Sequence, residues 1–421
     1  MRKMKDSGIP WVGEIPKNWE IKRLKYVMDN YDYERIPVDA VKRSQVGEKL
    51  YDYYGASGVI DKIDGYTSEG ERILIGEDGA NLLLRNLPVI YIANGKYWVN
   101  NHAHILKPKG NGNLHFFAKQ MECIDYTKYI TGSAQPKLSR SNLELVRLVV
   151  PPISEQYRIA DFLDSKCSKI DSIRENVEAE IEALKQYKCS IITEAVTKGL
   201  DKNVEMKDSG IPWIGEIPKE WVICKVKNVV SHIGSGTTPT SGKIEFYENG
   251  TVNWIQSGDL YETNKINETN KKVSESAIKL FPALHIYKAK FIVIAMYGAS
   301  VGNIAISNID ACVNQACCCI KTNEFNNLKY MFYWLFSCKN DFLKITDGGG
   351  QPNISQTKIK KQYYLKPPIE EQHRIVDFLD TKCARIDSII QKKQELLANL
   401  DTYKKSLIYE YVTGKKEVPA V

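Results

Sequence analysis

The sequence predicts an α+β protein in which two mixed α/β modules are separated by two long antiparallel helices, a coiled coil, arranged as a pseudo-twofold tandem duplication. Two internal repeats predict this fold. One begins at residue 153 with I-S-E-Q-Y-R-I-A-D-F-L-D and returns at residue 369 as I-E-E-Q-H-R-I-V-D-F-L-D. The other begins at residue 4 and at residue 206 with M-K-D-S-G-I-P-W. Self-similarity along a chain is the signature of a duplicated architecture.

Both copies of the first repeat have the hydrophobic spacing of a coiled-coil helix. Apolar residues that recur every seven positions form a seam that packs on a partner helix. The predicted seam consists of Leu163, Ile170, Val177, Leu184 and Ile191 in the first copy, and of Leu379, Ile386, Leu400 and Leu407 in the second, where Lys393 interrupts it. A neighbouring row is predicted from Ile159, Ile173, Tyr187, Ile375, Ile389, Leu396 and Tyr403.

The short connection after the first helix predicts how the two helices pair. Lys198 to Glu205 can span at most roughly 28 Å, whereas each helix is expected to be roughly 65 Å long. The chain cannot return along the helix over that distance. We therefore expect an antiparallel pair with the two modules at its opposite ends.

The remaining organisation follows from the position of the repeats. Residues 4 to 25 and their copy, 206 to 227, are rich in Pro, Trp and Gly, which favours a compact extended docking segment over a helix. In the first module the runs R-I-L-I-G, P-V-I-Y-I and K-Y-W-V predict strands. The expected boundaries are 1–25 and 201–227 for the docking segments, 26–150 and 228–366 for the modules, 151–200 and 367–416 for the helices, and 417–421 for a tail.

Composition favours a soluble cytoplasmic protein of two or three domains. Hydrophobic residues make up 43% and charged residues 26% of the 421 positions, as in ordinary globular proteins. The first residues form no apolar signal sequence, and no apolar run is long enough for a bilayer, so no membrane partner is expected. The ten cysteines include no C-x-x-C pair and are interpreted as reduced, mostly buried residues.

The net charge of +7 is modest, but basic residues gather late in each module. From residue 96 to 150 only three carboxylates oppose the Lys and Arg residues, and Lys358, Lys360, Lys361 and Lys366 precede the second proline pair. Such zones suit a polyanion such as nucleic acid. A merely solvated face is the alternative that charge alone leaves open.

No catalytic, cofactor-binding or metal-binding constellation is predicted. The Pro pairs are followed by Ile153 and Ile369, so the Asp/Asn-Pro-Pro-aromatic tetrad of amino methyltransferases is missing. Residues 234 to 243 resemble a phosphate loop, but Ile244 stands where a Mg²⁺-binding Ser or Thr belongs. His102 and His104 share one strand face without further ligands, so core or DNA-facing histidines are favoured over a metal site.

Several motifs together resemble the specificity subunits of type I restriction–modification systems. They are the repeated P-P-I-x-E-Q-x-R-I-x-D-F-L-D and G-I-P-W-x-G-E-I-P-K-x-W, a Q-P-x-[L/I]-S before each helix, and G-S-G-T-T-P-T, W-I-Q-S-G-D-L and Y-G-A-S-V-G-N-I-A-I in the second module. The resemblance covers essentially the whole chain. It implies a non-catalytic subunit with two target recognition domains, each of which reads one half of a split site in double-stranded DNA.

The resemblance also implies partners. Two methylation subunits would carry S-adenosylmethionine and modify adenine, and restriction subunits would use ATP and Mg²⁺, while this chain itself binds no cofactor. Two other functions are weighed against this one: a coiled-coil adaptor with two protein-binding heads, which the basic zones disfavour, and a single-chain enzyme that fuses recognition with cleavage, against which the missing catalytic motifs speak. Neighbouring genes for an adenine methyltransferase and a helicase-nuclease would separate the leading hypothesis from the adaptor.

Candidate DNA-binding residues follow from the matching motifs. Gln and Asn can bond an adenine edge, Arg and Lys suit guanine or phosphate, and Ser can position the backbone. The candidates are Gln135, Lys137, Ser139 and Arg140 in the first module, and Ser235, Thr237, Thr238, Gln256, Ser257, Asp259, Gln351, Asn353, Ser355 and Lys358 in the second. For the Q-P motifs a purely structural turn is the alternative. The first module lacks the G-T-T-P signature, so its counterparts of those residues stay unassigned.

Overall fold

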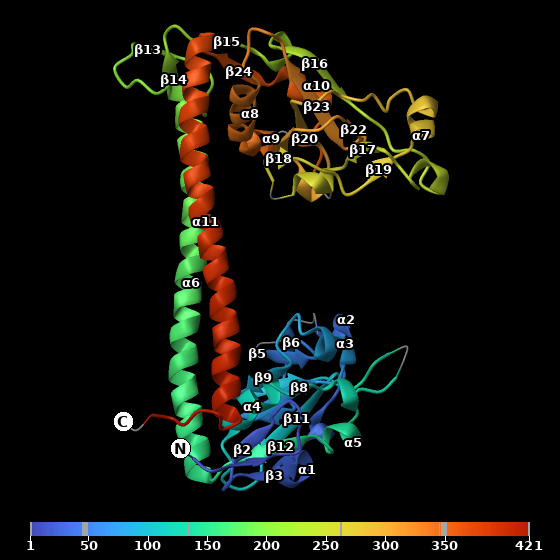
Figure 1. The fold of residues 1–421 in the computed structure, drawn as a ribbon, viewed down its shortest axis with the longest axis vertical. Coiled ribbons are helices and arrows are strands. Elements are labelled where there is room, and N and C mark those ends of the chain that lie inside the picture. The colour runs from blue at the N-terminus through green and yellow to red at the C-terminus, as the bar shows by residue number, and fades with distance from the viewer. Residues whose placement is uncertain are drawn as a thin grey trace. The chain divides into compact units, whose positions relative to one another are not determined.

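The computed structural model describes residues 2–43, 49–132, 135–261, 263–344, 346 and 352–419. The chain divides into two compact units, which are described separately. Unit 1 is Met1–Glu178 with Gln394–Val421, and unit 2 is Ala179–Lys393. Each unit contains one α/β module and a part of both long helices, α6 (Ile153–Lys198) and α11 (Ile369–Val412) (Figure 1).

Within each unit the two helices run antiparallel. Cross-helix ion pairs join Lys404 to Asp171 (2.6 Å) and Arg174 to Asp401 (3.1 Å) in unit 1, and Lys188 to Asp387 (2.6 Å) and Lys393 to Glu180 in unit 2. In both units, the residue number of the α11 partner decreases as the residue number on α6 increases. The predicted antiparallel pairing is therefore confirmed.

The predicted seam is the packed face of the helices. Leu163, Ile170 and Val177 are buried on α6, and Leu379 and Ile386 on α11. Leu407 is also buried, while Leu184, Ile191 and Leu400 are partly buried. The seven-residue spacing is therefore confirmed as the contact stripe.

The predicted neighbouring row is wrong except at its first positions. Ile159 and Ile375 are buried, but Ile173, Tyr187, Ile389, Leu396 and Tyr403 are each 37% to 58% exposed. The row that completes the seam instead lies four residues after each seam position, at Cys167, Arg174, Ile181 and Lys188 on α6 and at Cys383, Ile390, Leu397 and Lys404 on α11. Three of these residues are cations whose aliphatic stems pack while their charged ends pair with aspartates.

Module 1 contains two four-stranded sheets. One has the order β4-β11-β8-β9, from β4 (Met28–Asn30), β11 (Ala103–Pro108), β8 (Arg72–Gly76) and β9 (Ile90–Ala93). The other has the order β6-β5-β10-β7, from β6 (Gly58–Asp64), β5 (Leu50–Gly55), β10 (Lys96–Val99) and β7 (Ser68–Glu69). The other elements are α1 (Leu24–Val27), α2 (Ala40–Arg43), α3 (Gly79–Leu84), α4 (Leu114–Glu122), α5 (Arg140–Leu143), and β3 (Glu20–Arg23) paired with β12 (Arg147–Val150). The three strands predicted from the sequence are β8, β9 and β10.

Module 2 repeats this topology with a different sequence. Its larger sheet has the order β16-β23-β20-β21-β18, from β16 (Val230–Ser235), β23 (Cys317–Thr322), β20 (Phe291–Ala295), β21 (Ile304–Ser307) and β18 (Lys265–Ile266). A second sheet contains β19 (Lys272–Val273), β17 (Val252–Ile255) and β22 (Ala311–Val313). The other elements are α7 (Glu275–Leu280), α8 (Leu328–Ser337), α9 (Lys339–Lys344), α10 (Gln356–Lys361), and β15 (Val222–Lys225) paired with β24 (Tyr363–Lys366).

The strand pairings show that the two modules are duplicates. The antiparallel order β4-β11-β8-β9 corresponds to β16-β23-β20-β21, and a parallel pair, β5–β10 or β17–β22, occurs in each module. The duplication therefore extends through the modules, where sequence similarity alone had faded.

The repeated docking segments are β-hairpins that hold the helix ends. Strands β1 (Met4–Asp6) and β2 (Glu14–Pro16) pair in unit 1, as β13 (Met206–Asp208) and β14 (Glu216–Pro218) do in unit 2. The buried Trp19 donates its indole N–H to Glu155 at the start of α6 (3.0 Å), and Trp221 donates in the same way to Glu371 on α11 (3.0 Å). These extended segments anchored by tryptophans agree with the prediction.

The glutamine of each P-P-I-x-E-Q motif fastens a module to its helix. Gln156 is buried, accepts from the backbone N–H of Asn113 (3.0 Å) and donates to the carbonyl of Pro151 (2.9 Å). Gln372 makes the same pair of bonds with Asn327 (2.9 Å) and Pro367 (3.0 Å). Because the two asparagines cap α4 and α8, each glutamine sets where the first turn of a module helix meets the long helix.

Among the described residues, no helix is both long enough and apolar enough to cross a membrane.

Candidate nucleic-acid interface

The two Q-P motifs are attached to their modules by the same backbone bonds. In module 1 the N–H of Gly79 donates to Pro136 (2.7 Å) and the N–H of Leu138 donates to Glu77 (2.9 Å). In module 2 the N–H of Gly298 donates to Pro352 (3.0 Å) and the N–H of Ile354 donates to Met296 (2.8 Å). Each motif is thus joined to the chain that leaves β8 or β20.

The serines of both motifs have a structural role. The Ser139 hydroxyl accepts from the N–H of Asn142 and caps α5, and the Ser355 hydroxyl accepts from the N–H of Lys358 and caps α10. Capping satisfies a donor that the helix leaves free. The hydrophobic residues before them, Leu138 and Ile354, are buried. For these positions the structural-turn alternative accounts for the residue type.

The other candidates of the Q-P motifs lie at or near the surface. Gln135 and Arg140 are exposed, and Lys137 is partly exposed. Arg140 pairs with Glu144 four residues on (2.9 Å), a surface contact of little energetic weight. Asn353 forms an isolated bridge with Tyr297. Gln351 lies outside the described residues.

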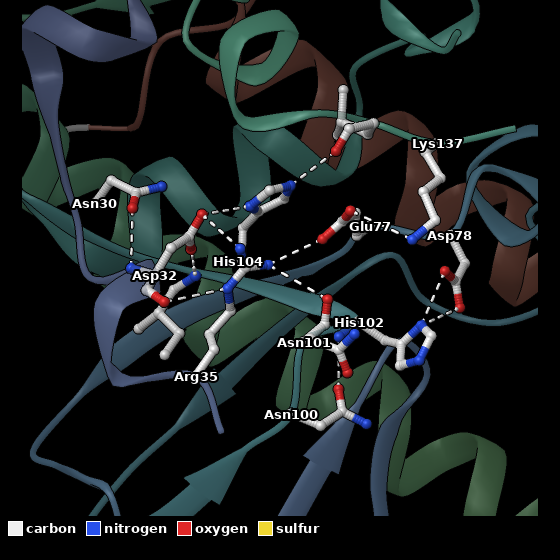
Figure 2. Close-up of polar contacts among 12 residues, drawn as sticks. Asn30, Asp32, Arg35, Glu77, Asp78, Asn100, Asn101, His102, His104 and Lys137 are labelled. Carbon is white, nitrogen blue, oxygen red and sulfur yellow. Dashed lines mark hydrogen bonds and ion pairs between the residues drawn. The ribbon is translucent and has the colours of Figure 1, made fainter. Parts of the chain in front are cut away.

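Behind the Q-P loop of module 1 is a charged network that crosses three segments of the chain (Figure 2). Lys137 lies 3.5 Å from Glu77 Oε1, and Arg35 Nη1 donates to Glu77 Oε2 (2.9 Å). Arg35 also pairs with Asp32 (3.4 Å). Two cations from the loop and from the segment after β4 therefore share one carboxylate, so their positions are linked.

His104 connects this network to the Q-P loop. Its Nε2 lies 2.7 Å from the Leu138 carbonyl, and its Nδ1 lies 2.7 Å from Asp32 Oδ2, with both side chains almost fully buried. The carbonyl can only accept, so Nε2 donates to it. Burial alone would raise the pKa of Asp32, but hydrogen bonds from His104 and from the N–H of Ile105, with the nearby charge of Arg35, lower it. The buried His104–Asp32 pair thus supports the Q-P loop from the interior of module 1.

His102 is placed differently and faces the surface. Its Nδ1 lies 3.1 Å from both carboxylate oxygens of Asp78, and the two side chains are nearly half exposed. Among the described residues, no group of three or more His, Cys, Asp and Glu side chains is arranged to hold a metal ion.

Arg35 is a candidate residue that sequence reasoning missed. The register that aligns residue 4 with residue 206 also aligns Pro37 with Pro239, and it places Arg35 opposite Thr237 of the G-T-T-P signature. The shared proline was the available signal. Module 1 therefore does have a counterpart of that loop, with an arginine in place of a threonine.

In module 2 the structure brings the G-S-G-T-T-P loop next to α10, the helix that follows the Q-P motif. Gln356 of α10 donates to the Ser235 hydroxyl (2.6 Å), and Thr238 donates to Gln315 (2.5 Å). Thr237 is partly exposed. Gly236 is required by packing, because a Cβ there would lie 1.7 Å from the carbonyl oxygen of Val313. This contact explains the glycine that made the run look like a phosphate loop.

The W-I-Q-S-G-D-L candidates form a separate turn. The Gln256 N–H donates to Asp259 Oδ2 (2.8 Å), and Asp259 Oδ1 accepts from the Asn270 side chain (2.6 Å). Both Asp259 oxygens are thus engaged within the module, while Gln256 and Ser257 are partly exposed. This geometry gives Asp259 a role in shaping the turn.

Comparison with known proteins agrees with this architecture. The sequence model of the type I restriction modification DNA specificity domain matches residues 16–183 and again residues 218–398. A putative type I restriction enzyme specificity subunit of Haemophilus influenzae is 26% identical over 336 residues, which cover 78% of this chain and 79% of that one. The putative type I restriction enzyme MjaX specificity subunit of Methanocaldococcus jannaschii is 24% identical over 456 residues, 97% of this chain and 96% of that one.

A solved structure extends the likeness to the fold. A chain from a study of complex assembly and conformational transition in the type I R-M system superposes with a TM-score of 0.68 at 13% identity, covering 96% of this chain and 99% of that chain. The duplicated α/β modules and paired helices therefore define a type I specificity-subunit fold. With two copies of the family domain, this chain belongs to the type I restriction–modification DNA specificity family. The resemblance found in the sequence is confirmed.

Proposed function

We propose that this chain gives a type I restriction–modification complex its DNA sequence specificity, with each module reading one half of a bipartite site in double-stranded DNA. The observation that carries this proposal is the repeated attachment of the two Q-P loops. Their backbone bonds and serine caps are the same, whereas the side chains beside them differ: Arg35, Lys137 and Arg140 in module 1, and Thr237 and Asn353 in module 2. A common frame with different polar groups suits two readers of different bases.

The proposal includes the division of labour in the complex. The chain itself performs no chemistry and binds no cofactor. Two methylation subunits supply S-adenosylmethionine and modify adenine, and restriction subunits supply ATP-dependent cleavage with Mg²⁺. The long helices set the distance between the half-sites. The domain boundaries given above belong to this proposal, with module 2 as the exchangeable segment 228–366.

Exposed apolar residues on the helices support the docking of two copies of one partner. Unit 1 exposes Ile173 and Tyr403, and unit 2 exposes the equivalent Ile389 and Tyr187. Apolar side chains that neither helix buries suit a protein interface, and aromatic residues are enriched there. Because the same pair of residues occurs in each unit, two methylation subunits would meet the same chemistry.

Exchange of module 2 tests the proposal. Residues 228–366 are replaced by the matching module of a relative, and the complex with the cognate methylation subunit is assayed by methylome sequencing. We expect one half of the methylated motif to change and the other half to stay. Methyl transfer by the purified chain alone, or a simultaneous change of both halves, would contradict the proposal.

A further inference from the structure

A cluster of two histidines and a tyrosine lies beside the candidate DNA-binding loop of module 2. The rings of His232 and His285 have centroids 6.0 Å apart, and each also packs on Tyr287, at 5.3 and 4.8 Å. His232 Nε2 lies 3.2 Å from the Tyr287 hydroxyl. Tyr287 is buried whereas both histidines are exposed, so a core residue orients two surface imidazoles.

The cluster is built into the loop. A Cβ at Gly234 would lie 2.9 Å from His232 Nε2 and 3.0 Å from the Tyr287 hydroxyl. The first glycine of G-S-G-T-T-P thus leaves room for the histidine–tyrosine contact. His232 and Ser235 also lie on the same strand, β16, and the Ser235 hydroxyl accepts from Gln356 of α10.

The charges around the cluster are positive. Lys321 is the cross-strand partner of His232 on β23, and Lys360 of α10 is near enough to act on its charge. Burial and the charges of His285, Lys321 and Lys360 lower the pKa of His232. Asp310 is close enough to Lys321 for their charges to interact, but its carboxylate is engaged by Lys288 Nζ (2.8 Å) and the N–H of Ala289 (2.8 Å). In the described part of the chain, neither histidine has a carboxylate partner.

We propose that His232, His285, Lys321 and Lys360 form a phosphate-contacting site for the DNA backbone beside the bases read by module 2, and that DNA binding at this site takes up a proton on the histidine pair. The proposal rests on the proposed function. A phosphodiester supplies the negative charge that this cluster lacks, and imidazole is the side chain that gains a positive charge most readily as the pH falls below neutral. Module 2 therefore binds DNA more tightly as the pH falls.

The direction of this pH dependence follows from the linkage between proton binding and DNA binding. The pKa of His232 is lowered in the free chain, so protonation disfavours the folded free chain as the pH falls through that range. Bound phosphate raises the pKa again, and the bound state holds more protons than the free state. For one proton, the association constant increases by at most about tenfold per pH unit.

The experiment uses the full chain with its methylation subunit and a fluorescent cognate duplex. Affinity is measured from pH 5.5 to 8 at several salt concentrations for the wild type and for a variant with His232→Asn and His285→Asn. His373→Asn, at an exposed position of α11 in the same unit, is the matched control. We expect tighter wild-type and control binding at low pH, and a double variant whose affinity changes several-fold less with pH.

A second pair of changes tests the lysines. Lys321→Gln with Lys360→Gln should lower the salt dependence of binding by about one to two counterions, with the methylated sequence unchanged. If the wild type binds its sequence specifically and the folded histidine double variant keeps the same pH dependence, this phosphate site is wrong and the proposed function still stands. Absence of sequence-specific binding by the wild type at every pH would overturn the proposed function, and this site with it.

Discussion

The buried histidine of module 1 gives a prediction that the structure makes quantitative. His104→Ala removes the hydrogen-bond donor of the Leu138 carbonyl and one of the partners of the Asp32 carboxylate, both 2.7 Å from the ring, while Asp32 keeps Arg35 and the N–H of Ile105. Leaving the buried Leu138 carbonyl without a donor costs about 1 to 3 kcal/mol. For a unit of this size, each kcal/mol lowers the melting temperature by about 2 to 4 °C. We expect the transition of unit 1 to fall by roughly 2 to 12 °C.

Calorimetry of the full chain measures this change, and His115→Ala is the matched control. His115 pairs with Glu71 at 3.1 Å in the same module, but the two side chains are 39% and 40% exposed. An exposed pair is worth no more than about 1 kcal/mol. Equal effects of the two substitutions would refute the role of burial in this argument.

Acidic pH should reduce the stability difference between the wild type and His104→Ala. The folded-state pKa of Asp32 is lowered, so the carboxylate contributes stability above its unfolded value of about 3.9 and loses it as the pH falls through the folded value. The difference in unfolding free energy between wild type and His104→Ala should become smaller below about pH 4.

In the methylation complex the same variant should weaken reading of the first half-site and leave the second intact. Loss of both halves with unit 2 still folded would contradict a local role.

Three further predictions follow from other contacts. Gly236→Ala should prevent normal folding of unit 2, because a Cβ there would lie 1.7 Å from a carbonyl oxygen, whereas Gly242→Ala meets nothing within 4 Å and should be silent in thermal denaturation. Gln156→Leu leaves two buried backbone groups unpaired and should destabilise unit 1 by about 2 to 4 kcal/mol in calorimetry; a loss below 0.5 kcal/mol would mean that the glutamine does not fasten the module. Inserting seven residues after Val177 and after Lys393 preserves the seam phase, lengthens the helices by about 10 Å, and should lengthen the unread gap by roughly three base pairs in methylome sequencing. An unchanged gap in an active protein would mean that the helices do not set the spacing, and a two-residue insertion should instead damage folding.

The sequence predicted the features that depend on local period and repetition. The seam from Leu163 to Val177 follows a seven-residue rule, and R-I-L-I-G is β8 because a short apolar run bounded by glycine suits a buried strand. The row beside the seam was misassigned because its positions include cations such as Lys188. The side chain of Lys188 is only 12% exposed, so hydrophobicity alone gave the wrong neighbours.

The polar site lay beyond sequence reasoning for a different reason. Arg35, Glu77 and Lys137 come together only because β4, β8 and the Q-P loop meet in the folded module. Their separation along the chain leaves no local period. The Q-P motif could be found as a repeat, but the support that His104 gives it depends on tertiary structure.

The attachment of each module to the long helices has a consequence for inheritance. Gln156 bonds Asn113, and Asp164 pairs with His115 (3.3 Å) and Lys119, to attach module 1; in module 2, Gln372 bonds Asn327, and Asp380 pairs with Lys329 and accepts from the Tyr333 hydroxyl (2.7 Å). The helix sides of these bonds lie in the repeated segments, whereas the module sides differ apart from the asparagine N–H: His115 and Lys119 in module 1, and Lys329 and Tyr333 in module 2. Genetic recombination with breakpoints in the repeats can therefore import a different module whose first helix offers hydrogen-bond donors to the same glutamine and aspartate. If the modules read DNA as proposed, one such event would change the DNA target without compensating mutations in the helices.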